Sequence, residues 1–191
     1  MSINRQGNLY TIIFAAVLVA VVGFVLSIVY IQLRPKQLEN IKDDTRKQIL
    51  ASIRIVPADK SKINEDYTRY ITDSFIVNDR GEKVDKQIDP FDVNVSEEVK
   101  KPDQERLLPV FVATTPEGTK YIIPVYGAGL WGPIWGYVAF DDNGDTIYGA
   151  YFSHSGETPG LGAEIEKPAF QDQFRGKNVF ENGDFTSVAV V

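Results

Sequence analysis

A long uncharged apolar stretch near the start of the chain constrains its fold more than any other feature. No charged residue occurs between Gly7 and Leu33, and residues 9–33 read LYTIIFAAVLVAVVGFVLSIVYIQL. As a helix this stretch would be about 37 Å long, enough to span a bilayer with some tilt. A cleaved signal peptide would have a shorter apolar region ending in a small-residue cleavage site, which residues 30–35 lack. We therefore predict a transmembrane signal-anchor helix over residues 9–33, after a short N-terminal tail of residues 1–8.

The charges beside this predicted helix conflict over its orientation. Arg5 precedes the apolar stretch, whereas Arg34, Lys36 and Lys42 follow it. The basic residues after the stretch favour a cytoplasmic domain, but a long domain is translocated largely regardless of nearby charge. The charge pattern alone therefore leaves the orientation open.

A second helical pattern continues directly from the apolar stretch. Residues 34–56 place apolar side chains at helical spacing, with charged residues on the other faces. The face that we expect to be mainly apolar comprises Leu38, Ile41, Thr45, Ile49 and Ile53. The pattern predicts an amphipathic stalk helix over residues 34–56.

Residues 57–191 have the patterning of one small mixed domain. Short alternating or apolar runs end at turn sequences such as Asn-Asp-Arg-Gly at 78–81 and Thr-Pro-Glu-Gly at 115–118. We expect strands at 74–77, 107–114, 119–126, 135–140 and 146–153, a helix at 168–174, and a strand-like segment at 178–191. The predicted fold class is α+β, with an N-terminal transmembrane helix and a twisted antiparallel sheet flanked by helices.

Composition excludes several kinds of chemistry. A net charge of −6 argues against nucleic-acid binding, since no basic stripe is present to neutralise phosphates. The sequence has no cysteine, which excludes thiolate metal sites, iron–sulfur clusters and c-type haem within it. Its single histidine, His154, argues against histidine-rich metal centres and Ser-His-Asp hydrolysis. Redox chemistry would therefore need an organic cofactor or protein partners.

Two motifs that suggest ligand sites are better explained as turns. Asp141, Asn143 and Asp145 have the spacing of a calcium loop, but glycine occupies the fourth position, and Phe152 stands where the bidentate glutamate belongs. Asp-Asn-Gly between two strands is typical of a hairpin turn. Residues 127–129, Gly-Ala-Gly, lack the rest of a dinucleotide-binding fingerprint.

Two glycine-rich stretches are stronger candidates for a ligand site. Residues 153–162 read SHSGETPGLG, in which three glycines and a proline prevent a strand or helix from continuing. Residues 127–136 read GAGLWGPIWG, and an indole ring on such a loop can wall a planar ligand. Each stretch also has a plainer interpretation, as an ordinary turn or, for Trp131 and Trp135, as an anchor of the core. For Trp135 we favour the core.

The 153–162 stretch carries a family resemblance. The run His-x-x-Glu-Thr-Pro-Gly-Leu-Gly, at 154–162, resembles the signature of the FMN-binding domain in the C subunit of the sodium-translocating NADH:quinone oxidoreductase. That domain is shared with the G subunit of the Rnf electron-transport complex. The Gly-x-Gly-Leu-Trp element at 127–131 also resembles the NADH:quinone oxidoreductase family and is less typical of the Rnf protein.

The resemblance implies specific contacts with FMN and no acid–base catalyst. Hydrogen bonds to the flavin would come from Glu157 and Thr158. The flavin ring would approach the backbone at Gly160, Leu161 and Gly162, with Leu130 and Trp131 packed nearby. No metal ligand is expected.

The resemblance also implies that FMN is joined through its phosphate to a threonine. The family motif for this linkage is Ser/Asp-Gly-Ala/Ser-Thr, which residues 1–191 do not contain, and Thr186 lacks the glycine and the small residue before it. We expect the domain of residues 57–191 to stop before the attachment segment of the complete protein. This chain by itself can therefore lack FMN and have no activity of its own.

The function implied is electron relay in a respiratory complex that couples NADH oxidation and quinone reduction to sodium transport. The domain would lie on the periplasmic side of the cell inner membrane, anchored in lipid beside the integral membrane and flavin-bearing partners of the complex. Two alternatives are the G subunit of an Rnf-type ferredoxin:NAD complex and a flavin-free membrane-anchored module. Co-purifying proteins would distinguish the first alternative, and a flavin assay the second.

Overall fold

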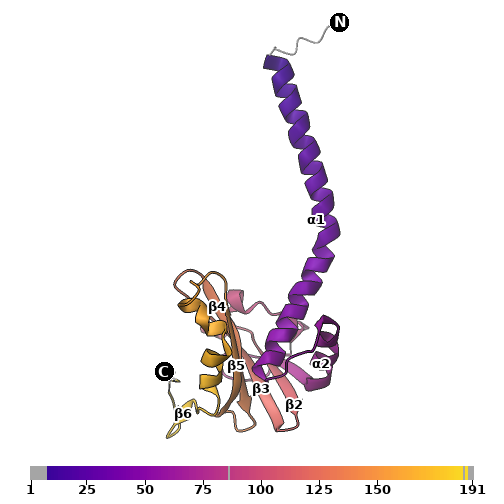
Figure 1. Ribbon diagram of the computed structural model, residues 1–191. Helices are drawn as coiled ribbons and strands as arrows, with labels where there is room; N and C mark the ends of the chain where they lie inside the picture. Colours follow the sequence, from indigo (N-terminus) through magenta and orange to yellow (C-terminus); the bar gives the residue numbers. More distant parts are fainter. Residues whose placement is uncertain (1–7, 86, 187, 189–191) are drawn as a thin grey trace. The chain divides into compact units, whose positions relative to one another are not determined.

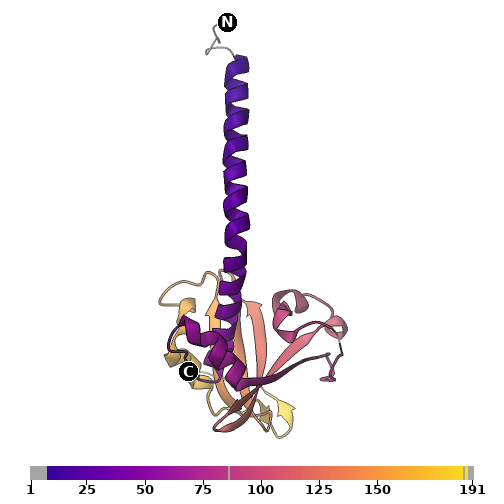
Figure 2. The ribbon, with the colours of Figure 1, turned by 90° about the vertical axis from the view of Figure 1, so that its right-hand side faces the viewer.

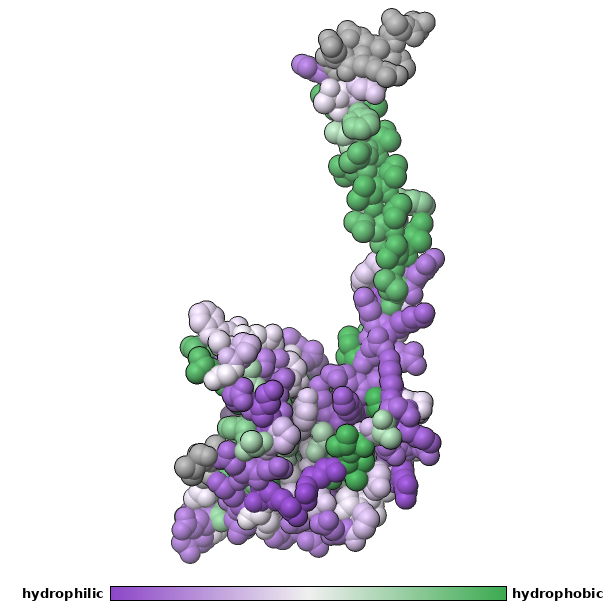
Figure 3. Space-filling view, in the orientation of Figure 1, coloured by the Kyte–Doolittle hydropathy of each residue, from purple (hydrophilic) through white to green (hydrophobic). Residues whose placement is uncertain are grey.

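The computed structural model describes residues 8–85, 87–186 and 188. The chain forms two compact units, Met1–Lys42 and Asp43–Val191, and helix α1 (Asn8–Ser52) contributes to both. The apolar stretch and the predicted stalk as far as Ser52 are therefore parts of one helix, with Pro35 inside it, and residues 53–56 lie beyond its end. Side chains of α1 in the first unit are exposed and mostly hydrophobic (Figure 3), and this helix is long and apolar enough to cross a membrane.

A turn of left-handed backbone ends helix α1. Arg54 has a φ of 64°, its N–H donates to the Ala51 carbonyl at 2.9 Å, and the Ile55 N–H donates to the Leu50 carbonyl at 3.0 Å. This pair of hydrogen bonds is the Schellman arrangement, which satisfies carbonyls at a helix end. The chain then continues to η1 (Lys60–Lys62) and α2 (Ile63–Tyr70).

Five antiparallel strands form the main sheet (Figure 1), in the order β1-β2-β3-β4-β5. They are β1 (Ile71–Val77), β2 (Leu108–Thr115), β3 (Gly118–Ala128), β4 (Pro133–Asp141) and β5 (Ile147–His154). Neighbouring strands in the sequence are neighbours in the sheet, so β2 to β5 form a meander. The α+β prediction and its antiparallel sheet are confirmed.

Short elements complete the second unit. Between β1 and β2 lie η2 (Pro90–Asp92), α3 (Val95–Glu98) and η3 (Asp103–Glu105). After β5 come η4 (Gly162–Glu166), α4 (Pro168–Gln171) and η5 (Asp172–Phe174). The helix expected at 168–174 is thus α4 followed by a tighter 3₁₀ turn, and Phe174 packs on Phe152 of β5 at 5.0 Å between ring centroids.

The strand-like segment expected at 178–191 forms, in its described part, a short hairpin of two strands. Strands β6 (Phe180–Glu181) and β7 (Asp184–Phe185) pair with each other and not with the main sheet. Asn182 and Gly183 turn the chain between them with φ values of 53° and 91°. Asparagine and glycine are the residues that tolerate such angles in a two-residue hairpin turn.

The last turns of α1 belong to the core of the sheet domain. Ile49, Leu50 and Ile53 are fully buried and pack in one cluster with Phe111 and Ile122. Figure 2 shows the end of α1 crossing the sheet. Gly149 of β5 permits the end of α1 to approach the sheet closely, because a Cβ at this position would collide with the Ser52 carbonyl oxygen.

Because of two partly buried tyrosines, we expect the protein to lose stability in strong alkali. Burial raises the pKa of both Tyr67 and Tyr137 to about 12; the next-largest causes are the negative charges of Asp89 for Tyr67 and Asp44 for Tyr137. In the unfolded chain a tyrosine ionises at roughly pH 10. As pH rises, the tyrosines therefore ionise in the unfolded state before they do so in the folded state. The contribution of the two protonated tyrosines to the free energy of unfolding is complete below the unfolded pKa. It is lost as pH rises from there through the folded pKa of about 12.

Urea unfolding from about pH 9 to pH 12 would measure this loss. Tyr137→Phe removes one of the two ionisable groups, so the decline of the free energy of unfolding with pH should become shallower. An unchanged pH slope in Tyr137→Phe would contradict the assignment.

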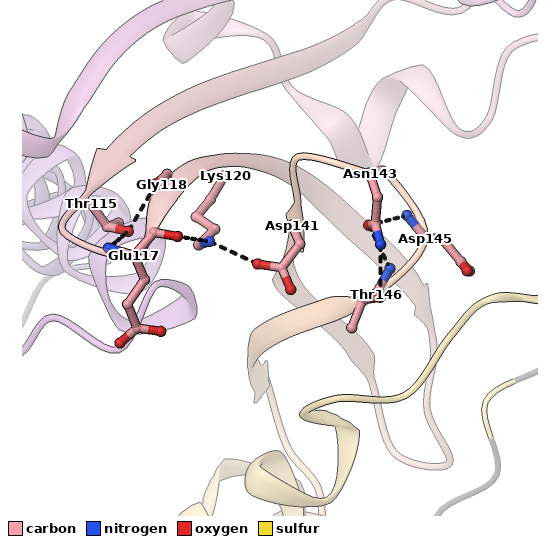
Figure 4. A network of polar contacts seen from close by, with 8 residues as sticks. All are labelled: Thr115, Glu117, Gly118, Lys120, Asp141, Asn143, Asp145 and Thr146. Carbon is pink, nitrogen blue, oxygen red and sulfur yellow. Dashed lines mark hydrogen bonds and ion pairs between the residues drawn. The ribbon is translucent and has the colours of Figure 1, made fainter.

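The turn between β4 and β5 is held by its own side chains (Figure 4), as the hairpin interpretation predicts. Asn143 Oδ1 accepts from the backbone N–H groups of Asp145 and Thr146, each at 3.0 Å. Asp141 Oδ1 accepts from Nζ of Lys120 at 2.7 Å, and that lysine is only 4% exposed. Within the described part of the chain, no group of three or more His, Cys, Asp and Glu side chains could hold a metal ion.

Asp145 joins this turn to the segment before β6, and its removal should loosen that segment. Its Oδ1 accepts from the backbone N–H groups of Val179 and Phe180 at 2.9 and 2.8 Å. We expect Asp145→Ala to lower the free energy of unfolding by about 1–2 kcal/mol, because it removes a charged acceptor from two backbone N–H groups, of which that of Val179 keeps its bond to the Asp145 carbonyl at 3.1 Å. It should also speed hydrogen exchange at Phe180, whose N–H donates to the carboxylate that is removed. The exposed Asp142→Ala is the matched control and should leave both measurements near the wild-type values.

Candidate cofactor-binding site

The two glycine-rich loops meet at one edge of the sheet because of strand register. Ala128, at the end of β3, pairs with Pro133 at the start of β4, so the first loop is a tight connection between them. Ile134 pairs in turn with His154 at the end of β5, where the second loop begins. A hydrogen bond of 3.1 Å from the Ser155 N–H to the Pro133 carbonyl extends this contact beyond the strands.

The carboxylate of Glu157 connects the two loops. Its Oε1 accepts from the backbone N–H of Trp131 at 2.9 Å, across 26 residues of sequence. Glu157 is only 9% exposed. A hydrogen bond from a neutral donor to a carboxylate is among the stronger kinds, and breaking it would leave a buried charge short of a partner. This carboxylate therefore fixes the spacing of the loops.

Two glycines leave the space that the Glu157 carboxylate occupies. A Cβ on Gly129 would collide with Glu157 Oε1 and would lie 2.8 Å from the Gly132 carbonyl oxygen. A Cβ on Gly162 would lie 2.5 Å from Glu157 Oε2. Gly129 also donates to the Gly132 carbonyl at 2.8 Å, which closes the first loop. Gly162 was among the residues predicted to contact FMN, whereas Gly129 was not, although its place in the Gly-x-Gly-Leu-Trp element was a signal.

Large apolar side chains stand exposed at the tips of both loops. Leu130, Trp131 and Leu161 are 83%, 69% and 73% exposed. Exposed apolar groups of this size usually mark a surface that contacts a ligand or partner. Thr158 is exposed too, and its carbonyl accepts from the N–H groups of Leu161 and Ala163, which shapes the second loop. Gly160 lies beside it with a φ of 76°, an angle that favours glycine.

The predicted contact residues thus lie on two adjacent loops, with one buried carboxylate between them. Their role as contacts to FMN remains a prediction. None of them lines a cavity of about 260 Å³ elsewhere in the second unit, whose walls include Arg54, Tyr148 and Arg175.

Trp135 lies next to the site and anchors it to the helix. Its Nε1 donates to Oε1 of Gln48 at 3.2 Å, and Gln48 Nε2 donates to Asp44 at 2.7 Å. The indole is partly buried. The sequence offered no signal for the glutamine, because 87 residues separate it from the tryptophan.

Comparison with protein families matches residues 129–189 to the FMN-binding domain. That segment begins at the first loop and includes the second. A sheet domain with this pair of loops, preceded by a helix long and apolar enough to cross a membrane, is typical of a protein of the FMN-binding class.

Curated relatives give the finer assignment. The C subunit of the Na(+)-translocating NADH-quinone reductase of Chlamydia caviae is 56% identical over 59 residues, which are 31% of this chain and 18% of that protein. The corresponding protein of Vibrio anguillarum is 28% identical over 208 residues, covering all of this chain and 80% of that protein. The first curated relatives are thus matched over only about a fifth of their own length, 18–22%.

Solved structures agree with the curated relatives. The crystal structure of the same subunit from Parabacteroides distasonis is 48% identical and has a TM-score of 0.76, over 83% of this chain and 76% of that one. The chain belongs to the NqrC family, the C subunits of the Na(+)-translocating NADH-quinone reductase. NqrC from Shewanella oneidensis, at 23% identity and a TM-score of 0.64, covers 78% of this chain and 76% of its own and shares the fold.

Proposed function

We propose that this chain is part of an electron-relay subunit that carries FMN in a Na(+)-translocating NADH-quinone reductase. The observation that carries the proposal is the buried Glu157 carboxylate, held between Gly129 and Gly162 and bonded to the Trp131 N–H at 2.9 Å. It links the two loops that lie within the segment matched to the FMN-binding domain. In the complete protein we propose that a threonine hydroxyl holds the flavin through its phosphate.

The residues on these loops fit a planar, hydrogen-bonding ligand. Glu157 and Thr158 offer polar groups, and the glycines allow a ring to lie against the backbone. The exposed apolar side chains of Leu130, Trp131 and Leu161 can exclude water from one face of such a ring. FMN supplies electron transfer when it is bound, and a carboxylate near it shifts its reduction potential. No acid–base catalyst from this chain is needed for that role.

We also propose that residues 9–33 anchor the protein in the cell inner membrane, with the sheet domain on the periplasmic side. The support is the exposed apolar surface of α1 in this segment. Just beyond it, Arg34 donates to the Tyr30 hydroxyl at 2.8 Å, a pairing suited to a membrane interface. Within the membrane, integral partners from the same complex would pack against α1, and Gly23 leaves room for close contact.

The test is intact mass with in-gel flavin fluorescence under denaturing conditions. The protein is expressed from its full reading frame, with and without its flavin transferase. We expect a mass increment of one FMN that survives denaturation, appears only with the transferase, and maps to a threonine. A full-length protein that retains no flavin under either condition would contradict the electron-relay proposal and leave a structural module.

A further inference from the structure

His154 is the last residue of β5, and its side chain contacts the backbone of the second loop. Its Nδ1 accepts a hydrogen bond of 3.1 Å from the N–H of Glu157. Its Nε2 lies 3.9 Å from Oε1 of Glu166 in η4, and the Ser153 hydroxyl donates to that same oxygen at 2.6 Å. The imidazole is 15% exposed. It therefore stands between the acid of η4 and the residue that joins the two loops.

The direction of these contacts selects one form of the ring. A backbone N–H only donates, so Nδ1 must be unprotonated to accept from Glu157. In the neutral imidazole the proton is then on Nε2, the nitrogen that lies toward Glu166. Protonating Nδ1 would replace an acceptor by a donor facing the Glu157 N–H.

We propose that His154 is a positioning residue for the flavin cradle formed by residues 128–133 and 155–162. Its Nδ1 fixes the backbone of Glu157, and the Glu157 carboxylate then holds the Trp131 N–H at 2.9 Å. This proposal rests on the proposed function only for the identity of the ligand. The hydrogen bonds themselves belong to the chain without FMN.

The geometry explains why a histidine is suited to this position. Glu157 is buried, and a buried backbone N–H without a partner is strongly disfavoured. An acceptor one atom beyond Cγ is needed, and both His Nδ1 and Asn Oδ1 can provide it. Asparagine keeps this acceptor but has no counterpart of Nε2, which lies 3.9 Å from Oε1 of Glu166. Asparagine is therefore a selective rescue variant.

Three variants distinguish the role of Nδ1 from that of Nε2. His154→Leu removes both polar atoms at similar bulk. His154→Asn keeps an acceptor near the place of Nδ1, and His154→Gln keeps a polar group nearer the place of Nε2. All are made in the full-length protein expressed without the flavin transferase, so that no bound flavin can order the loops.

Hydrogen exchange at the Glu157 amide is the first measurement. We expect exchange roughly tenfold faster in His154→Leu and His154→Gln, and within about twofold of wild type in His154→Asn. Because His154 is the single histidine of the sequence, ¹⁵N labelling of histidine reports its tautomer directly. In wild type the neutral ring should show an unprotonated Nδ1 and a protonated Nε2.

Two results would overturn the positioning role. One is wild-type exchange at Glu157 in His154→Leu, and the other is a ring that carries its proton on Nδ1. Fast exchange in His154→Asn, equal to that in His154→Leu, would also count against it, since a correctly placed acceptor should restore the bond.

The flavin potential gives an independent second readout. In the flavin-loaded complete protein, His154→Leu should shift the midpoint potential and His154→Asn should return it toward wild type, because both act through Glu157. If wild type binds no flavin, the proposed function fails while the exchange result still decides the role of His154. If flavin is bound but the potential is equal in all variants, the histidine does not position the cradle.

Discussion

Replacing Ile49 by alanine is expected to lower the free energy of unfolding of the sheet domain by about 2–5 kcal/mol. Ile49 lies near the end of α1, is 0% exposed and packs in the cluster that contains Phe111 and Ile122 of the sheet. Removing its outer carbons would lose apolar burial and leave a cavity that the surrounding side chains can only partly fill. Urea unfolding of the full chain in detergent, followed by tryptophan fluorescence, would measure the change.

Ile41→Ala is the matched control for this prediction. It removes the same atoms from the same helix, but Ile41 is 62% exposed and lies in the first unit. We expect a change within about 0.5 kcal/mol. Equal losses in the two variants would show that the end of α1 does not belong to the core of the domain.

Replacing Gly129 by alanine is expected to reduce FMN incorporation into the complete protein at least tenfold, a factor that corresponds to about 1.4 kcal/mol. The new Cβ would collide with Glu157 Oε1 and would lie 2.8 Å from the Gly132 carbonyl oxygen and 3.0 Å from Ile134 Cγ2. The backbone oxygen cannot move as freely as a side-chain end, and overpacking of this kind costs about 1–3 kcal/mol. The carboxylate would then lose its bond to the Trp131 N–H.

Flavin fluorescence per mole of purified protein is the measurement, and circular dichroism confirms that the sheet is intact. Gly156→Ala is the control, because its Cβ would meet only the Trp131 carbonyl oxygen, at an ordinary 3.6 Å. It should incorporate FMN as wild type does. Normal incorporation in Gly129→Ala would mean that the Glu157 position is not required for the flavin.

Much of the fold followed from local patterns. The five strands of the main sheet were predicted because period-two runs and turn sequences such as Asp-Asn-Gly act within a few residues. The 178–191 segment was expected only to be strand-like, and the hairpin turn at Asn182 and Gly183 was not predicted. The burial of Ile49 beside the exposure of Ile41 was not visible in a helical pattern that treats both alike.

The candidate site was predicted only in part. Its loops could be named from their glycines and from the resemblance around Glu157. The sequence did not show that Gly129 leaves space for the Glu157 carboxylate, or that His154 accepts from the Glu157 N–H. It also gave no sign of the Gln48 contact with Trp135.

The sequence by itself determined the apolar helix and the positions of the strands and of the two loops along the chain. These depend on hydrophobic periodicity and on turn residues, which act over short stretches of chain. Only the tertiary structure decided which atoms meet between the loops. The bond from the Trp131 N–H to Glu157 joins residues 26 apart, and it exists because the register of β3, β4 and β5 brings both loops to one edge of the sheet. Register is a property of paired strands, so neither loop alone could reveal it.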